Sequence, residues 1–147
     1  MSSLTIRPIE PGDYDAWHRL WAGYLEFYET SLPETTYQET FKRLCDKDNS
    51  EQMGFLAVQD GTPVGLVHYI FHAHNWRPEG VCYLQDLFAD PAARGTGVGR
   101  KLIEAVYAAA DAAGRPSVYW MTQEFNATAR QLYDRIATVT PFIKYQR

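Results

Sequence analysis

The stretch Arg94-Gly95-Thr96-Gly97-Val98-Gly99-Arg100 has the make-up of an anion-binding turn. Its glycines lie directly before an apolar-periodic run that reaches Ala113, where the backbone is expected to enter a helix. The first N–H groups of a helix have no intrahelical partner, the helix dipole is positive there, and glycine lets an anion approach closely. The two arginines would add charge-assisted hydrogen bonds. We expect phosphate binding here, with a Gly-rich surface turn of no function as the alternative.

Two nucleotide-binding motifs do not fit this stretch. A dinucleotide fingerprint needs Gly-x-Gly-x-x-Gly, whereas the glycines here are Gly95, Gly97 and Gly99. A P-loop needs Gly-Lys-Ser/Thr, whereas Gly99 is followed by Arg100 and Lys101. Both interpretations therefore fail on spacing.

Polar residues also occur inside strand-like segments. Asp86 lies in the middle of the apolar segment 81–89, where a carboxylate is costly to bury unless it is paired or functional. His68, His72 and His74 alternate onto one face if the preceding strand persists. No Glu-x-x-His motif or cysteine partner accompanies these histidines, so we predict no metal site. A role in lining a substrate site, or simply a surface position, is favoured.

These residues need a framework of strands and helices to position them. In chain order, the expected elements are a strand at 4–9, a helix after Asp13, a helix from Pro33 to Asp46, strands at 52–59 and 63–71 joined by the hairpin turn Asp60-Gly61, a long polar loop at 72–80 that overhangs a site, a strand at 81–89, a helix at 97–113 stopped by Gly114, a strand at 117–121, a helix at 127–136 capped by Asn126 and a last strand at 138–145. A helix between two strand segments predicts a βαβ unit with a parallel strand pair.

The first helix carries a stripe of aromatic residues. Tyr14, Trp17, Trp21, Tyr24 and Tyr28 recur at helical spacing, and such a stripe is most often part of the core. The alternative applies to its far end, where Tyr24, Phe27 and Tyr28, together with Glu26 and Glu29, wall a pocket for a substrate.

Composition limits the class of protein. The chain has 147 residues, 46% hydrophobic and 22% charged, which predicts a single globular domain over residues 1–147. Its net charge of -4 and the lack of a basic cluster argue against nucleic acid as a partner. Cys45 and Cys82 are far apart and predict reduced thiols. Because no signal region or run of about 18 apolar residues occurs, we expect a cytoplasmic protein without membrane contact.

The element order and two motifs resemble the GNAT superfamily of N-acetyltransferases. The motifs are Leu87-Phe88-Ala89-Asp90-Pro91-Ala92-Ala93-Arg94-Gly95-Thr96-Gly97-Val98-Gly99 and Asn126-Ala127-Thr128-Ala129-Arg130-Gln131-Leu132-Tyr133. They stand in the family's order, separated by one helix and one strand. The segment Tyr83-Leu84-Gln85-Asp86-Leu87-Phe88 is also similar to that of polyamine and histone acetyltransferase relatives.

The resemblance implies an α/β (α+β) fold with a mixed, mostly antiparallel sheet, splayed between strands four and five and flanked by about four helices. It implies that acetyl-CoA is the cosubstrate, without a metal. The residues implied to contact acetyl-CoA are Leu87, Phe88, Ala89, Arg94, Gly95, Thr96, Gly97, Val98, Gly99, Arg100, Asn126, Ala129 and Tyr133. The residues assigned to the acceptor site are Tyr24, Phe27, Tyr28, His68, His72, Tyr83 and Trp120.

The expected catalytic residues are Tyr133, Gln85 and Asp86. Tyr133 would stand beside the sulfur and donate a hydrogen bond or proton to the leaving thiolate, with core packing as the alternative. The family's polyamine-like pattern has Glu where this chain has Gln85, which cannot ionise. Either Asp86 or a water chain from Glu26 or Glu29 takes the amine proton, or the acceptor is a weaker base, or the enzyme is slow. Gln85 would still orient the amine through its carbonyl oxygen.

The sequence therefore predicts acetyl transfer from acetyl-CoA to a primary amine of a small molecule, by direct attack in a ternary complex. The alternatives are acetylation of a protein lysine or N-terminus and, because the base position is changed, a non-catalytic acyl-CoA-binding module. A homodimer is expected only by analogy with the family.

Overall fold

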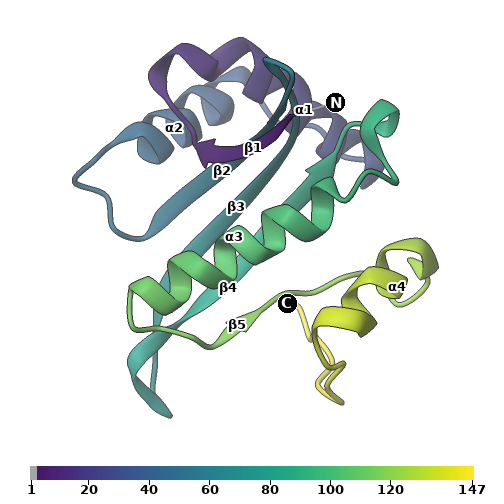
Figure 1. The fold of residues 1–147 in the computed structure, drawn as a ribbon. Coiled ribbons are helices and arrows are strands. Elements are labelled where there is room, and N and C mark those ends of the chain that lie inside the picture. The colour runs from purple at the N-terminus through teal and green to yellow at the C-terminus, as the bar shows by residue number, and fades with distance from the viewer. Residues whose placement is uncertain (1–2) are drawn as a thin grey trace.

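The computed structural model describes residues 3–147, which form one mixed sheet with helices on both faces (Figure 1). The strands and helices are β1 (Leu4–Pro8), α1 (Tyr14–Phe27), α2 (Glu34–Cys45), β2 (Gln52–Gln59), β3 (Thr62–His74), β4 (Arg77–Ala89), α3 (Val98–Ala112), β5 (Val118–Tyr119) and α4 (Ala127–Ile136), with short 3-10 turns η1 (Pro11–Asp13) and η2 (Pro91–Ala93). The strand order is β1-β2-β3-β4-β5. Every neighbouring pair in this sheet is antiparallel except β4 and β5, which are parallel. The predicted fold class is confirmed.

Two apolar cores lie on opposite faces of the sheet. α3 crosses one face, whereas α1 and α2 cover the other (Figure 1). The α3 core includes Val67, Leu84 and Leu102, and the α1 core includes Trp17, Leu20 and Leu66. Leu66 and Val67 point to different cores because successive side chains of a strand alternate between faces. His68 is therefore on the same face as Leu66, beneath α1.

The hairpin between β2 and β3 has the predicted turn. Gln59 pairs with Thr62, which leaves Asp60 and Gly61 as the two loop residues. Their φ values of 51° and 84° are those of a type I′ turn, which Asp-Gly favours.

The predicted long loop over residues 72–80 is wrong. β3 continues to His74 and β4 begins at Arg77, so these two residues pair around the tight turn Asn75-Trp76. The polar side chains there are tolerated because the tip of the hairpin is exposed, with Trp76 84% exposed. The hairpin therefore extends away from the cores instead of overhanging a site.

A β-bulge interrupts β4 at Gln85. Tyr69 pairs with Leu84 and His68 pairs with Asp86, which leaves Gln85 without an opposite residue on β3. An extra residue in one strand shifts the alternation of the side chains that follow it. Leu84 accordingly packs in the α3 core, whereas Asp86 turns to the α1 face and meets His68. The bulge therefore decides which face receives the only carboxylate in the middle of this strand.

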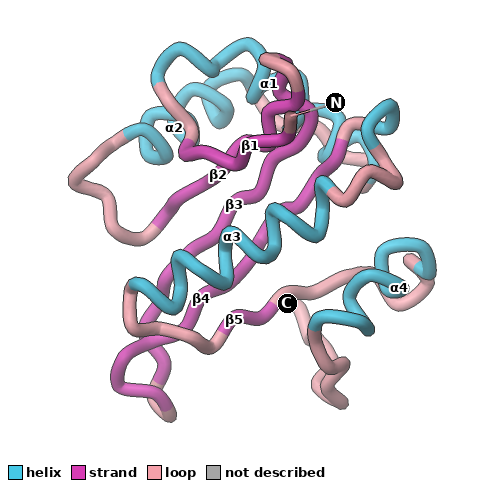
Figure 2. The backbone as a smooth tube through the Cα atoms, in the orientation of Figure 1, coloured by secondary structure: helices cyan, strands magenta, loops and turns pink. Residues whose placement is uncertain are grey.

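β4 and β5 separate soon after they meet. Their pairing is confined to Cys82 with Val118 and Tyr83 with Tyr119. β4 continues to Ala89, whereas the chain after β5 leaves towards α4 (Figure 2). The edge of β4 beyond Tyr83 is therefore not paired with β5, as the splayed sheet requires.

The predicted last strand at 138–145 is wrong. Residues 137–147 have no regular secondary structure, and Val139, Phe142, Ile143 and Tyr145 are 71% to 89% exposed. The segment has the β-branched and aromatic composition of a strand, but Pro141 has no N–H to donate. A strand also needs a neighbour, and within residues 3–147 the sheet ends at β5.

Asp13 and Asn126 stand at the N-cap positions of α1 and α4, but neither side chain makes the expected cap hydrogen bond. The Asp13 carboxylate instead accepts two hydrogen bonds from Arg7, at 2.7 and 2.9 Å, and one from the backbone N–H of Glu10. The Asn126 amide donates to Thr122 Oγ1 at 3.3 Å.

Candidate active site

The Gly-rich turn forms the N-terminus of α3, as its spacing predicts. Gly95 and Gly97 have φ values of 83° and 84°, a left-handed conformation that glycine adopts without steric cost. α3 begins at Val98, so the N–H groups of its first turn point out of the helix beside these glycines. A Cβ placed on either glycine meets nothing within 4 Å, which leaves the approach to those N–H groups open. The turn has the geometry to receive an anion.

The two arginines of the turn lie differently from each other. Arg94 Nε donates to the Ala89 carbonyl oxygen at 3.2 Å, and its guanidinium lies 5.7 Å from the centre of the Phe88 ring. Arg100 is exposed, with Nε 3.7 Å from Glu104 Oε1 one turn along α3. Arg94 therefore binds the end of β4, and Arg100 stands at the helix start, where an exposed ion pair contributes little.

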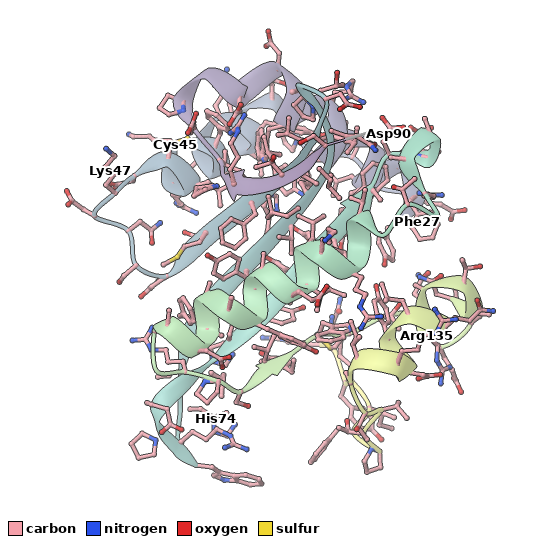
Figure 3. All side chains as sticks on the ribbon, viewed as in Figure 1. Phe27, Cys45, Lys47, His74, Asp90 and Arg135 are labelled. Atoms are coloured by element: carbon pink, nitrogen blue, oxygen red, sulfur yellow. The ribbon has the colours of Figure 1, made fainter. Side chains whose placement is uncertain are left out.

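An ion pair links helix α1 to Asp90, the residue that directly follows β4. Arg19 Nη1 is 3.0 Å from Asp90 Oδ2, and Asp90 Oδ1 accepts from the N–H of Ala92 in η2. The hydrogen bond from the Ala92 N–H, and then that from the Arg19 guanidinium, keep the pKa of the Asp90 carboxyl below its usual value. Figure 3 labels Phe27 and Asp90, which lie at this end of the molecule, whereas His74 lies at the opposite end.

Asp86 is a buried carboxylate, only 7% exposed. Its Oδ2 is 2.8 Å from His68 Nδ1, and His68 Nε2 accepts from Trp17 Nε1 at 2.9 Å. The three side chains come from β4, β3 and α1. They form a continuous polar chain on the α1 face of the sheet, beginning at Trp17 in the α1 core.

Tyrosines surround the other side of Asp86. The Tyr24 hydroxyl is 3.5 Å from the Gln85 carbonyl oxygen. Burial first, and then the nearby Asp86 charge, raise the pKa of Tyr24 and of Tyr28. Burial, Tyr119 and then Asp86 likewise raise the pKa of Tyr83. Each of these hydroxyls therefore stays protonated and remains a hydrogen-bond donor near the carboxylate.

Tyr133 stands on α4, next to Tyr28. Burial raises the pKa of Tyr133 to about 12, and the Tyr28 hydroxyl contributes in the same direction. The Tyr133 ring meets Trp120 edge to face at 5.4 Å. α4 also lies against the Gly-rich turn, because a Cβ on Gly99 would be 3.5 Å from Leu132 Cδ2. Tyr28 thus lies near both Asp86 and Tyr133, the two ionisable residues expected to be catalytic.

Not every predicted site residue joins this group. His72 lies further along β3, where its Nε2 is 2.8 Å from the Tyr119 hydroxyl. Trp120 contacts the group through Tyr133, and it also packs with Tyr107 and the α3 core. Gln85 is exposed at the bulge, and Phe27 is 52% exposed at the end of α1. Asn126 and Ala129 belong to the start of α4 and are half-buried. Their predicted roles remain predictions.

The sequence does not predict the hydrogen-bonding roles of two residues in this region. Its spacing places Trp17 in the core, where it is fully buried, but its indole N–H is also the donor to His68. Tyr119 stacks on Tyr83 at 4.8 Å and bonds His72. A buried polar side chain needs a hydrogen-bond partner. Applied to a buried His68, this rule would have indicated Trp17 as a candidate partner.

Glu26, Glu29, Thr30 and Ser31 line a shallow open hollow at the C-terminal end of α1. Both glutamates are exposed. This hollow gives an acidic rim to the same end of α1 that carries Tyr24 and Tyr28.

Residues 3–147 contain no group of three or more His, Cys, Asp or Glu side chains arranged to hold a metal ion. Over the same residues, none of the helices combines the length and the apolar character needed to cross a membrane.

Comparison with known proteins supplies the family. The model of the acetyltransferase (GNAT) family matches residues 15–137. A D-amino-acid N-acetyltransferase of Saccharomyces cerevisiae is 40% identical over 146 residues, which cover 98% of this chain and 90% of that protein.

Solved structures agree with this match at the level of the fold. An aminoglycoside N-acetyltransferase in complex with CoA has a TM-score of 0.86 and 18% identity, covering 100% of this chain and 95% of its own. A ribosomal-protein-alanine N-acetyltransferase from Brucella melitensis has a TM-score of 0.82 and 18% identity, covering 99% and 98%. Because both sequence identities are low, the similarity to these two structures supports the fold alone.

Proposed function

The chain belongs to the acetyltransferase (GNAT) family and is an N-acetyltransferase, and we propose that it transfers the acetyl group of acetyl-CoA to a primary amine of a small molecule. The amine attacks the thioester directly while both substrates are bound. The observation that carries the proposal is the splay of β4 from β5, which opens beside the Gly-rich turn at the start of α3.

We assign the pyrophosphate of acetyl-CoA to the backbone N–H groups from Gly95 to Arg100. The pantetheine arm extends along the unpaired edge of β4 at Leu87 to Ala89, as an added strand does. An N–H of this edge polarises the thioester carbonyl as it gains negative charge. The open space around Gly95 and Gly97, and the nearness of α4 to Gly99, support this assignment.

Arg94 already occupies one acceptor of that edge, the Ala89 carbonyl oxygen. We propose that this side chain releases the carbonyl when pantetheine binds and turns to the phosphates, to which a guanidinium donates bidentate hydrogen bonds.

Asp86 and Tyr133 are assigned as the base and the hydrogen-bond donor. As the nitrogen lone pair bonds to the thioester carbon, the nitrogen loses a proton to Asp86 and the C–S bond breaks. The leaving thiolate accepts a hydrogen bond from Tyr133. A thiol has a reference pKa near 8.5, well below that of Tyr133, so Tyr133 stabilises the thiolate without giving up its proton.

The acceptor is placed between the aromatic end of α1 and β4. Tyr24, Tyr28 and Tyr83 supply hydroxyl donors and ring faces, and Asp86 supplies the negative charge. The 40% identical yeast relative is a D-amino-acid N-acetyltransferase, so free amino acids are the first acceptors to test.

The test is thiol release from acetyl-CoA in the presence of single amines. D-amino acids, their L-enantiomers, polyamines, aryl amines and lysine-containing peptides form the panel. Turnover of free amines above peptides supports the proposal. Turnover confined to peptides would assign the chain to protein acetylation instead. CoA binding without turnover of any amine would indicate a non-catalytic module.

We also propose that the chain forms a homodimer through its C-terminal segment. Val139, Phe142, Ile143 and Tyr145 expose large apolar side chains, and β5 is an edge strand of the sheet. Apolar side chains gathered on one segment favour burial against another molecule. Light scattering of the protein and of a Phe142→Asp, Ile143→Asp variant tests this, and a monomeric parent protein would reject it.

A cytoplasmic location is proposed on the basis of the cysteines. Cys45 and Cys82 are both free thiols, and free thiols persist where the environment is reducing. Cell fractionation tests the location.

A further inference from the structure

A chain of hydrogen bonds passes from the core of the protein to the proposed acceptor site. Trp17 Nε1 lies 2.9 Å from His68 Nε2, and His68 Nδ1 lies 2.8 Å from Asp86 Oδ2. Trp17 is 0% exposed, His68 4% and Asp86 7%. Three separate elements, α1, β3 and β4, contribute one member each.

The chemistry of the three groups sets the direction of the chain. An indole N–H only donates, so His68 Nε2 must accept and carries no proton. The ring proton of the neutral imidazole is then on Nδ1, which donates to Asp86 Oδ2. Asp86 Oδ2 is the acceptor of this bond. A protonated imidazolium would lose the bond to Trp17, because both of its nitrogens are donors.

We propose that His68 is a positioning residue for acetyl transfer: it fixes Oδ2 of Asp86 so that Oδ1 faces the acceptor amine and receives its proton. The inference rests on the proposed function and deepens it. His68 thus acts behind the site through Asp86, and it does not touch the acceptor itself.

The burial of Asp86 explains why the hydrogen bond from His68 matters for its position. A carboxylate removed from water is costly unless it is hydrogen-bonded, and a bond to a charged acceptor is among the stronger ones. The bulge at Gln85 turns Asp86 to this face, where His68 is the residue paired with it across the strands. The titratable groups on the other sides are Tyr24 from α1, Tyr28 directly after α1 and Tyr83 from β4, all of which keep their protons.

A purely structural role for the His68–Asp86 pair is the competing explanation. Two amide variants separate the two roles, because they imitate different ring nitrogens. In His68→Asn the amide reaches the position of Nδ1 and keeps a donor for Asp86. In His68→Gln the amide reaches the position of Nε2 and keeps a partner for Trp17, but leaves Asp86 without its donor.

The experiment measures kcat, KM for the best amine of the panel and CoA affinity for both variants, with thermal unfolding as the check on folding. We expect His68→Gln to lower kcat by roughly 10- to 100-fold, the factor that corresponds to a hydrogen bond to a charged group. His68→Asn should keep kcat within a few-fold of the parent. Both variants should bind CoA as the parent does. Equal kcat in the two variants, or losses that follow only the melting temperature, would overturn the proposal.

A measurement on the unmodified protein keeps the inference testable if a variant does not fold. Nitrogen-15 NMR of the imidazole distinguishes the two neutral tautomers and the imidazolium. Neutral His68 with its proton on Nδ1 near pH 7.5 is expected, and a proton on Nε2 would overturn the assignment. If the parent protein acetylates no amine, the proposed function fails whatever tautomer is found, so the two failures are distinguishable.

Discussion

Val98, the first residue of α3, packs directly onto the backbone of Gly65 in β3. A Cβ on Gly65 would lie 2.8 Å from Val98 Cγ1 and 3.0 Å from the Phe88 carbonyl oxygen. Val98 is 2% exposed, so it has little room to move away. Because Gly65 has no side chain, Val98 can pack against the sheet at this distance. The Gly65 backbone therefore sets how close the start of α3, and with it the Gly-rich turn, lies to the sheet.

Replacing Gly65 with alanine should weaken both the fold and CoA binding. The new methyl group must displace Val98 or the β4 backbone, which costs about 1–3 kcal/mol of unfolding free energy. The displacement also moves the first N–H groups of α3, so CoA affinity should fall. Denaturant unfolding and calorimetry measure the two effects.

Gly54→Ala is the matched control, because its methyl group would lie 2.6 Å from Ile9 Cδ1 and 2.9 Å from the Val67 carbonyl oxygen. It should lose comparable stability and keep the affinity of the parent for CoA. Similar CoA affinities in the two variants would contradict the proposed cradle.

Gly97→Ala tests the turn itself. Alanine in the left-handed conformation costs roughly 1–2 kcal/mol, and relaxation of that strain would move the N–H groups at the helix start. CoA affinity should fall by about 10-fold or more, the equivalent of one charged hydrogen bond. Gly114→Ala imposes the same type of strain, at φ 71° and the other end of α3, and should leave CoA affinity unchanged. If both variants bind CoA equally, the turn does not hold the anion.

The chemistry of neighbouring residues was sufficient to predict the helices, the hairpin turn and the Gly-rich turn from the sequence. Asp60-Gly61 and Gly97 adopt the positive φ values that their residue types favour, and Gly114 ends α3 as expected. These features depend on a few adjacent residues, so the sequence alone contains their physical cause.

The features that depend on pairing between distant strands were not predictable in the same way. The bulge at Gln85 exists only relative to the register of His68 and Tyr69 on β3. The segment around Phe142 has the composition of a strand, but a strand forms only against a neighbour. The Trp17–His68–Asp86 chain likewise unites residues up to 69 positions apart, counted from Trp17 to Asp86.

Tyr133→Phe should lower kcat with little change in CoA affinity. Phenylalanine keeps the edge-to-face contact with Trp120 but removes the donor that would stabilise the thiolate. A loss of roughly 10- to 100-fold in kcat is expected for one hydrogen bond to a developing charge. Tyr107→Phe is the control, because the Tyr107 hydroxyl donates to the Ile136 carbonyl and not to the site. An unchanged kcat in Tyr133→Phe would reject its role.

The protein should lose stability in alkali through its buried acidic side chains. Burial raises the pKa of Cys82 to about 11 and that of Tyr69 to about 12. The unfolded chain releases these protons near pH 9 to 10, whereas the folded protein keeps them, so unfolding becomes easier as pH rises from about 9 to 12. Each group contributes up to about 1.4 kcal/mol per pH unit within its own window.

Unfolding by urea across this pH range measures the alkaline loss. Tyr69→Phe keeps the ring stacked on Phe55 at 5.3 Å and removes one titrating group, so its stability should fall less steeply between pH 10 and 12. A slope equal to that of the parent would show that Tyr69 does not contribute.

Gln85→Glu should raise the rate with alkyl amines. The residue is exposed at the bulge, and no β3 residue is paired with it, so a carboxylate there costs little desolvation. A glutamate here would supply a second proton acceptor close to Asp86. Because Asp86 already serves as the base, we expect a gain of only roughly 3- to 10-fold in kcat/KM, below the usual contribution of a general base. The gain should be greatest near neutral pH, where an alkyl amine with a pKa of about 10.4 is mostly protonated.

Gln38→Glu is the control, because it adds the same charge on the exposed face of α2, and it should leave kcat/KM unchanged. A lower rate in Gln85→Glu would show instead that the neutral amide of Gln85 orients the amine, and that a second carboxylate beside Asp86 impairs the reaction.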